Sequence, residues 1–175
     1  DVRQERPDLV AVGLGNPGRQ YRRTRHNVGQ MVIERLVDQP PTGCRLRRAR
    51  REQPLLEYDG LTILLYTPRA FMNVSGVEIE RLLGRLSVDP DHLLVIHDDL
   101  DLPLGRLQAR FNGSDAGHRG MRSICTHLAS VEFYRLRIGI DRPMWGEDAA
   151  DYVLRPFAQA EHELLEKVLN RAVDE

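Results

Sequence analysis

Apolar segments of strand length alternate with helical apolar patterns along this chain, and this alternation limits the folds that it can adopt. Segments of this length that are continuously apolar, or that alternate with polar residues, indicate strands. The predicted strands lie at residues 9–14, 55–58, 61–66, 93–96, 107–111 and 134–140. Apolar residues at helical spacing predict helices between and after them. These helices contain residues 28–37, 77–86, 121–128, 149–154 and 161–173.

One predicted hairpin lies within this pattern. Asp59-Gly60 separates two of the strands, and this dipeptide favours a two-residue turn. Strands that alternate with helices favour an α/β fold whose sheet is covered on both faces. We therefore expect residues 1–175 to form a single three-layer domain with a central mixed, mostly parallel sheet flanked by helices. Polar loops follow several strand ends, where α/β domains usually place their sites.

Two further expectations concern local structure. The helix that contains residues 77–86 is expected to be capped by Asn73 or Ser75, because short polar side chains accept hydrogen bonds from the first backbone N–H groups. Residues 43–53 are rich in arginine, and their apolar residues follow neither helical spacing nor strand alternation. We therefore expect them to be irregular.

The composition excludes several classes of protein. Hydrophobic residues make up 41% and charged residues 29% of the 175 residues, which is unlike a disordered chain. No apolar run approaches the roughly 18 residues of a membrane span, and the start lacks the apolar region of a signal peptide. Cys44 and Cys125 form no CxxC pair, which argues against a disulfide framework or a cysteine-rich zinc site. We expect a cytoplasmic protein with no membrane partner.

Charge is distributed unevenly, although the net charge is only −1. Ten arginines lie between Arg19 and Arg51, opposed by Glu34 and Asp38, which gives this segment about +8. Residues 141–175 carry about −5. One hypothesis is that the basic segment holds a polyanion on one face of the molecule. The alternative is a solvated charged surface, and charge alone does not separate the two.

The glycine-rich segment Gly13–Gly18 resembles a phosphate-binding loop only superficially. It lacks the third glycine of the dinucleotide fingerprint and the Lys-Ser/Thr ending of a P-loop. It indicates a sharp turn that presents the amide of Asn16 at a strand end. His26, just before the helix 28–37, is a candidate catalytic residue because imidazole accepts a proton near neutral pH. The alternative is a histidine that merely neighbours a helix cap.

A histidine and three carboxylates follow the strand 93–96, in the sequence His97-Asp98-Asp99-Leu100-Asp101. This composition occurs in metal sites, but the glycine and final glutamate of a calcium loop are missing. Alternation sends Asp98 to one face of the strand and Asp99 and Asp101 to the other. We therefore favour Asp98 as the partner of a distant histidine, whose tautomer it would fix.

Five motifs stand in order along most of the chain. They are G-L-G-N-P-G-x-x-Y-x-x-T-R-H-N-x-G at 13–29, P-x-x-F-M-N-x-S-G at 68–76, H-D-D-L-D-L-P at 97–103, G-H-x-G-x-x-S at 117–123 and R-L-R-I-G-I at 135–140. Together they resemble the bacterial peptidyl-tRNA hydrolases. The resemblance implies an α/β domain and a monomeric, metal-free esterase without a cofactor, whose partner is peptidyl-tRNA.

The resemblance also implies roles for individual residues. His26 would take a proton from the attacking water, Asp98 would hold that imidazole, and Asn16 would separate blocked from free aminoacyl-tRNA. Its substrate-binding and tRNA-binding positions correspond to Tyr21, Phe71, Asn73, Arg110, His118, Arg119 and Arg137. Asn73 would grip the substrate main chain, the aromatic rings would stack on the terminal nucleotide, and Arg137 would meet a phosphate.

Two departures from the family pattern affect these positions. Arg119 stands where the family usually has asparagine, so a charged donor replaces an amide that both donates and accepts. Gln108 stands where the family often has a phosphate-binding lysine, and Arg106 and Arg110 flank it. Two other functions stay open at this point. One is an RNA-binding protein of the same fold without catalysis, such as a splicing factor, and the other is a small-molecule hydrolase or nucleosidase.

Overall fold

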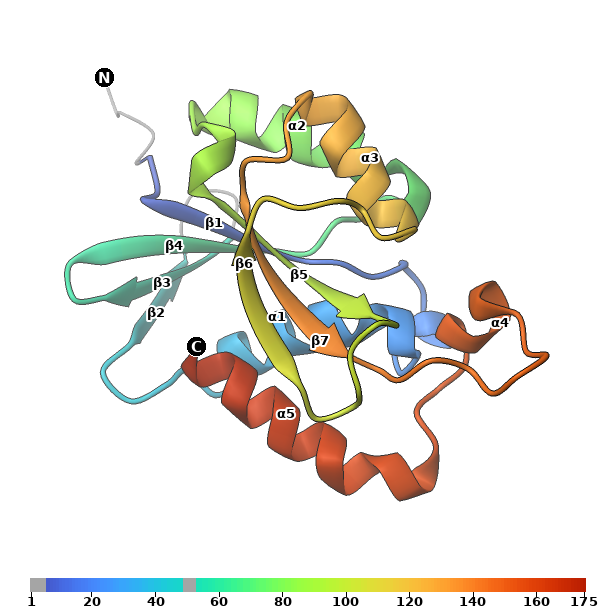
Figure 1. Ribbon diagram of the computed structural model, residues 1–175. Coiled ribbons are helices and arrows are strands. Elements are labelled where there is room, and N and C mark those ends of the chain that lie inside the picture. Colours follow the sequence, from blue (N-terminus) through green and yellow to red (C-terminus); the bar gives the residue numbers. More distant parts are fainter. Residues whose placement is uncertain (1–5, 49–52) are drawn as a thin grey trace.

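The computed structural model describes residues 6–48 and 53–175 (Figure 1). Its centre is a seven-stranded sheet with the order β2-β3-β4-β1-β5-β7-β6. The strands are β1 (Leu9–Gly13), β2 (Arg45–Arg48), β3 (Pro54–Tyr58), β4 (Leu61–Tyr66), β5 (Leu93–Asp99), β6 (Leu107–Phe111) and β7 (Tyr134–Gly139). The four neighbouring strands β4, β1, β5 and β7 pair in parallel. The outer pairs β2–β3, β3–β4 and β6–β7 are antiparallel, which confirms the predicted mixed sheet.

The helices cover both faces of the sheet. They are α1 (Val28–Asp38), α2 (Ser75–Leu86), α3 (Arg119–Leu128), α4 (Ala149–Val153) and α5 (His162–Asp174). In Figure 1, α2 and α3 lie above the sheet, α1 and α5 lie below it, and α4 lies beside the ends of the central strands. The three-layer prediction is therefore confirmed. In the described part of the chain, every helix is too short or too polar to cross a membrane.

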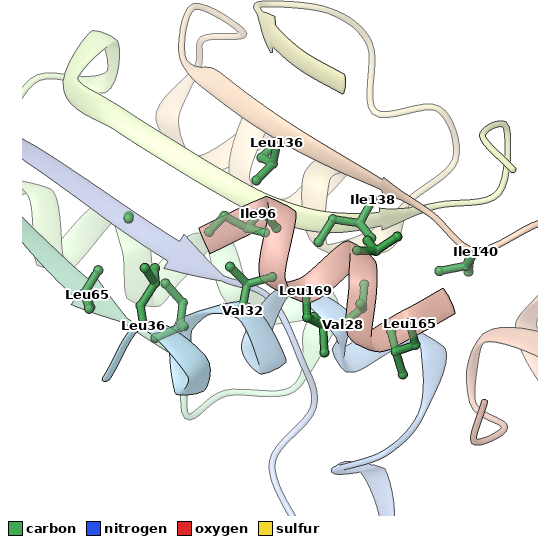
Figure 2. Packing of buried hydrophobic residues seen from close by; sticks show 14 of the residues in the cluster. Val28, Val32, Leu36, Leu65, Ile96, Leu136, Ile138, Ile140, Leu165 and Leu169 are labelled. Carbon is green, nitrogen blue, oxygen red and sulfur yellow. The ribbon is translucent and has the colours of Figure 1, made fainter. Parts of the chain in front are cut away.

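Side-chain alternation along the strands divides the core in two. Ala11 of β1 and Ile96 of β5 face α1 and α5, whereas Val10 and Val12 face α2 and α3. Figure 2 shows the first of these layers. There Val28, Val32, Leu36, Leu165 and Leu169 of the two helices meet Ile96, Leu136 and Ile138 of the strands. Because the central strands are buried on both faces, they are continuously apolar, as the sequence suggested.

A close backbone approach brings the start of α1 against β5. A Cβ atom at Gly29 would lie 2.1 Å from the carbonyl oxygen of Ile96. Only glycine allows this distance, because any side chain would push the helix away from the strand. The turn that precedes α1 is consequently held close to the C-terminal end of β5.

The sequence-based expectation for residues 43–53 was wrong for part of that segment. Residues 45–48 form the edge strand β2, paired with β3, and residues 49–52 lie outside the described residues. Arg45 and Arg47 both form ion pairs with Glu57 on the facing strand. A strand with a single apolar residue is therefore stabilised by its neighbour, which its own sequence could not indicate.

The predicted cap of α2 was also wrong. Val74 occupies the N-cap position, and no side chain caps the helix there. A short 3-10 turn, Met72–Val74, leads directly into the helix, so Asn73 lies within that turn. The Ser75 hydroxyl donates to the carbonyl of Met72 instead. The chain thus continues helically from one element to the next, and Asn73 stays exposed.

Several arginines of the basic segment between Arg19 and Arg51 pair with carboxylates outside that segment. Arg25 is buried and pairs with Glu161, while Arg35 pairs with Glu166 of the acidic C-terminal segment. Arg45 and Arg47 share a carboxylate on β3, as described above. Burial and pairing therefore remove Arg25 from any face that could bind a polyanion.

Candidate active site

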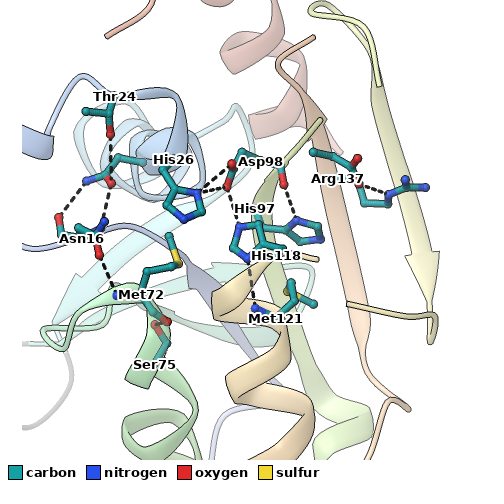
Figure 3. A network of polar contacts seen from close by, with 12 residues as sticks. Asn16, Thr24, His26, Met72, Ser75, His97, Asp98, His118, Met121 and Arg137 are labelled. Carbon is teal, nitrogen blue, oxygen red and sulfur yellow. Dashed lines mark hydrogen bonds and ion pairs between the residues drawn. The ribbon is translucent and has the colours of Figure 1, made fainter. Parts of the chain in front are cut away.

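Two distant segments bring His26 and Asp98 together. His26 lies in the 3-10 turn Arg25–Asn27 before α1, and Asp98 lies near the C-terminal end of β5. The Nδ1 atom of His26 is 2.9 Å from Oδ2 and 3.0 Å from Oδ1 of Asp98 (Figure 3). Only 2% of the Asp98 side chain and 12% of the His26 side chain are exposed. Asp99 points to the other face of the strand, where it meets Arg137, as alternation predicted.

This geometry fixes the tautomer of His26. A carboxylate accepts hydrogen bonds, so Nδ1 carries the proton that it donates to Asp98. Within the described chain, Nε2 of His26 has no hydrogen-bond partner, and the residue lines a cavity. Nε2 is therefore the ring nitrogen that is free to accept a proton from a bound water.

A second histidine shares the same carboxylate. Nε2 of His118 lies 2.7 Å from Oδ1 of Asp98, and the ring centroids of His118 and His26 are 4.8 Å apart. Nδ1 of His118 accepts from the backbone N–H of Met121 and so caps α3. That hydrogen bond makes Nε2 the protonated nitrogen, which donates to Asp98. The sequence placed His118 among the substrate-binding positions and did not indicate this contact.

The charge states of the pair follow from these contacts. Burial by itself raises the pKa of Asp98, but its hydrogen bonds and attraction to His26 and His118 outweigh burial and hold that pKa well below its usual range. Burial likewise lowers the pKa of His26, and the charge and hydrogen bond of Asp98 more than offset it, so the net pKa is raised. The Arg119 cation opposes this rise. Asp98 is an anion, and His26 titrates above its ordinary value.

His97 lies behind this pair and is completely buried. Its Nδ1 donates to the backbone carbonyl of Asp98, and its ring packs edge-on against His118, with centroids 5.2 Å apart. Its Nε2 is buried without a partner among the described residues. Burial and the neighbouring His118 lower the pKa of His97 to about 4, so it is neutral at physiological pH.

The same three residues form a possible set of metal ligands. The donor atoms of His26, Asp98 and His118 lie within 4.8 Å of one another. However, their N···O distances of 2.7–3.0 Å are those of direct hydrogen bonds. Two ligands about 2.0–2.1 Å from a tetrahedral zinc ion would be roughly 3.3 Å apart. A metal would therefore have to displace both protons and separate the groups, so the arrangement fits an acid–base pair better than a metal centre.

Asn16 is held in one orientation beside the pair. Its Oδ1 accepts from the backbone N–H of Met72 at 2.8 Å. The side chain of Asn27 binds the backbone N–H and carbonyl of Asn16, each at 2.9 Å. Because a backbone N–H can only donate, the Asn16 amide nitrogen must point away from Met72. Asn27, which sequence reasoning did not single out, is the residue that fixes this loop.

The two predicted aromatic positions lie next to each other, and one of them, Phe71, lines the cavity. Tyr21 and Phe71 make an edge-to-face contact with ring centroids 6.3 Å apart. Phe71 is 54% exposed and lines the cavity together with Asn73. An exposed aromatic ring beside a reactive pair offers a surface on which a base or an apolar group can stack.

The cavity that contains His26 has a volume of about 550 Å³. One wall is α4 and the residues on either side of it, which present mostly apolar side chains. The opposite side is cationic. Its arginines are Arg110 on β6, Arg119 at the start of α3, and Arg135 and Arg137 on β7.

The cationic side has a defined geometry. Arg110 and Arg135 face each other directly across β6 and β7, and Arg137 follows two residues later on the same face. Arg135 is buried and donates to the carbonyls of Gly113 and Ser114, which holds the loop before α3. Arg137 donates to Asp99 at 2.7 Å and to Gln108. Gln108 therefore orients an arginine, and the sequence indicated neither Arg135 nor this contact.

Comparisons with known proteins identify the family of the chain. A family model described as peptidyl-tRNA hydrolase matches residues 10–175. Peptidyl-tRNA hydrolases of Moorella thermoacetica and Aquifex aeolicus are 46% and 42% identical to the chain, covering 94% of it in both cases and 86% and 85% of their own lengths. The crystal structure of peptidyl-tRNA hydrolase from Acinetobacter baumannii is 31% identical, covers 95% of this chain and 85% of its own, and has a TM-score of 0.81. The chain therefore belongs to the peptidyl-tRNA hydrolase family.

Proposed function

We propose that the chain hydrolyses the ester bond of peptidyl-tRNA, the reaction of its family, with His26 as the general base. The single observation that supports this role is the hydrogen bond from Nδ1 of His26 to Asp98, which leaves Nε2 to face the cavity. Nε2 accepts a proton from water, and the resulting hydroxide attacks the ester carbonyl. The buried Asp98 carboxylate stabilises the imidazolium that forms. The proton then passes to the departing ribose oxygen.

Asn16 discriminates between blocked and free amino groups in this proposal. Because its oxygen is occupied by Met72, the amide nitrogen offers a donor to the substrate. The carbonyl oxygens of a peptide accept such a hydrogen bond, whereas a free α-ammonium group has only donors. A donor that faces a donor is left unpaired, which disfavours free aminoacyl-tRNA. The exposed Asn73 binds the peptide main chain on the same side of the cavity.

We further propose that Arg110, Arg119 and Arg137 contact tRNA phosphates, while Tyr21 and Phe71 stack on the 3′ end. Phosphate contacts position an RNA without reading its sequence, which suits an enzyme that accepts many tRNAs. His118 lies beside His26 and donates to the same carboxylate, which supports Asp98. We expect a monomer that acts in the cytoplasm without metal or cofactor. The free thiols of Cys44 and Cys125 are consistent with a reducing compartment.

The test is release of peptide from an N-blocked aminoacyl-tRNA, measured without added metal, both with and without EDTA. His26→Ala is expected to lower kcat by about 10²–10⁴-fold and to leave tRNA affinity unchanged, because a general base acts only in the chemical step. His92→Ala is the matched control, since His92 is an exposed histidine that pairs with Asp91.

Three outcomes would contradict this proposal. Loss of tRNA affinity in the His26 variant would assign that residue to binding. Activity that EDTA abolishes would require a metal. Intact tRNA binding without any release by the unmodified protein would favour the alternative function, an RNA-binding protein of the same fold.

A further inference from the structure

The apolar wall of the cavity consists of a helix that is too short to hold its own position. Helix α4 has five residues, and isolated helices shorter than about 12 residues are marginal in water. Ala149, Ala150 and Val153 line the cavity. Tyr152, on the other side of the helix, is buried, and its hydroxyl donates to the carbonyl of Ile140. The position of this wall therefore depends on what packs behind Tyr152.

Arg25 lies behind Tyr152 and binds the C-terminal end of α4. Its guanidinium carbon is 4.1 Å from the centroid of the Tyr152 ring. Its Nη1 donates to three backbone carbonyls, those of Tyr152 at 3.4 Å, Arg155 at 3.5 Å and Pro156 at 3.1 Å. The Tyr152 carbonyl belongs to the last turn of α4, where helix carbonyls carry partial negative charge, and the other two carbonyls lie in the segment that follows the helix. Arg25 thus supplies a cationic cap from another part of the chain.

Glu161 completes this contact and balances its charge. Nη2 of Arg25 lies 2.7 Å from Oε1 of Glu161, and the two side chains are only 8% and 19% exposed. The same carboxylate oxygen accepts from the backbone N–H of Ala158. A shielded pair of this kind has a strict geometry, because displacement of either group leaves a charge buried without a partner.

The turn Arg25–Asn27 therefore contacts three parts of the cavity through consecutive residues. Arg25 holds α4, His26 binds Asp98, and Asn27 holds the backbone of Asn16. The backbone reinforces the first of these links, because Arg25 N–H donates to the carbonyl of Arg155 at 3.1 Å. A single rigid turn thus relates the base, the apolar wall and the loop that carries Asn16.

We propose that Arg25 is a positioning residue that sets the place of the α4 wall relative to His26, and so determines how tightly the substrate binds against that wall. This inference rests on the proposed function. Arg25 touches neither water nor substrate in this role. It acts through α4, whose cavity-facing side chains make the contact. The alternative is that the Arg25–Glu161 pair only stabilises the fold.

The test compares two substitutions in the pair with two in a control pair. Arg25→Lys keeps the charge but loses the fork that reaches the carbonyls and Glu161 together. Glu161→Gln keeps the acceptor oxygen and should have a smaller effect in the same direction. The controls are Arg35→Lys and Glu166→Gln, because that pair also joins the basic segment to α5 but contacts neither the turn nor α4.

Three quantities separate positioning from stability. For Arg25→Lys we expect KM for an N-blocked aminoacyl-tRNA to rise about tenfold while kcat stays within about twofold, because substrate and transition state lose the same contact. The pH profile should not change, since His26 and Asp98 are untouched. Amide hydrogen exchange in residues 149–155 should become faster. The controls should lower Tm at most, with unchanged KM and exchange in α4.

The proposal is overturned if Arg25→Lys folds with unchanged KM, or if α4 exchanges as in the unmodified protein. If Arg25→Lys does not fold, Glu161→Gln decides by the same two readouts. Failure of the proposed function is distinguishable, because it would appear as absence of hydrolysis by the unmodified protein. The exchange measurement would still decide whether Arg25 holds α4.

Discussion

Hydrogen bonds within the protein decide which atom of each polar residue faces the substrate. Asp98 accepts a hydrogen bond from Nδ1–H of His26 and so leaves Nε2 as the base. Met72 occupies the oxygen of Asn16 and leaves the amide nitrogen as a donor. In both cases one partner fixes an otherwise ambiguous side chain, so substrate-facing chemistry is set before substrate arrives.

Arg119 should tune the base at the residue scale. His26 acts only when neutral, and its raised pKa makes kcat/KM fall as the pH drops through that value. The Arg119 cation lowers that pKa, whereas Asp98 raises it. Arg119→Asn should therefore raise the pKa further and move the acidic limb of the kcat/KM profile to higher pH. Arg122→Asn is the control on the same helix, where Arg122 pairs with Asp115. A limb that stays in place, or moves to lower pH, would contradict this prediction.

At the scale of elements, the active pair depends on how closely α1 approaches β5. Gly29 allows the helix to lie against the carbonyl of Ile96, two residues before Asp98. The turn that carries His26 immediately precedes this helix. The separation of His26 from Asp98 is therefore set by helix–strand packing, and the hydrogen bond between them is a consequence of it.

Gly29→Ala should break this approach. Its Cβ would lie 2.1 Å from the Ile96 carbonyl, so the helix must shift. We expect a destabilisation of about 1–3 kcal/mol and a loss of hydrolysis that exceeds the loss of folded protein. Gly84→Ala in α2 is the matched control, because nothing lies within 4 Å of its Cβ position. That variant should be about 0.5–1 kcal/mol more stable. Urea denaturation measures the stability of each variant, and release of peptide measures its activity. Equal effects of Gly29→Ala and Gly84→Ala on these two quantities would refute the prediction.

At the scale of the whole molecule, charge that is concentrated in sequence differs from charge that is available for binding. Several arginines of the basic segment 19–51 are paired with carboxylates on β3 and in the C-terminal region. The arginines of the cavity come instead from β6, β7 and the start of α3. Among the described residues, Arg110 and Arg119 have neither an ion pair nor a hydrogen bond through their side chains, so both remain able to bind an anion.

The salt dependence of tRNA affinity tests this distribution. Binding should weaken with rising salt, because each phosphate contact releases counterions. Arg110→Gln is expected to reduce the slope of log K against log salt by about 1. Arg45→Gln, which removes a guanidinium already paired with Glu57, should leave the slope unchanged. The reverse pattern would place the tRNA on the basic segment after all.

Local patterns in the sequence were enough to predict most of the fold. Apolar runs and periodicity located the central strands and the helices, and Asp59-Gly60 located the hairpin, where both residues have positive φ. These signals are readable because each depends on neighbouring residues and on burial of one or two faces. Alternation along β5 also placed Asp98 and Asp99 on opposite faces. The assignment of His26 and Asp98 to one site came from the family motifs.

Only the tertiary structure decided which partner each polar group found. It paired β2 with β3, turned His118 toward Asp98, and placed Arg25 behind α4. It also left α2 without a side-chain cap, because a preceding turn supplied the helical start. The contacts of His118 with Asp98 and of Arg25 with α4 join residues that are 20 and 127 positions apart, and a charged or polar residue carries no mark of its distant partner. Its hydrogen bonds are settled only when packing of the apolar layers brings the segments together.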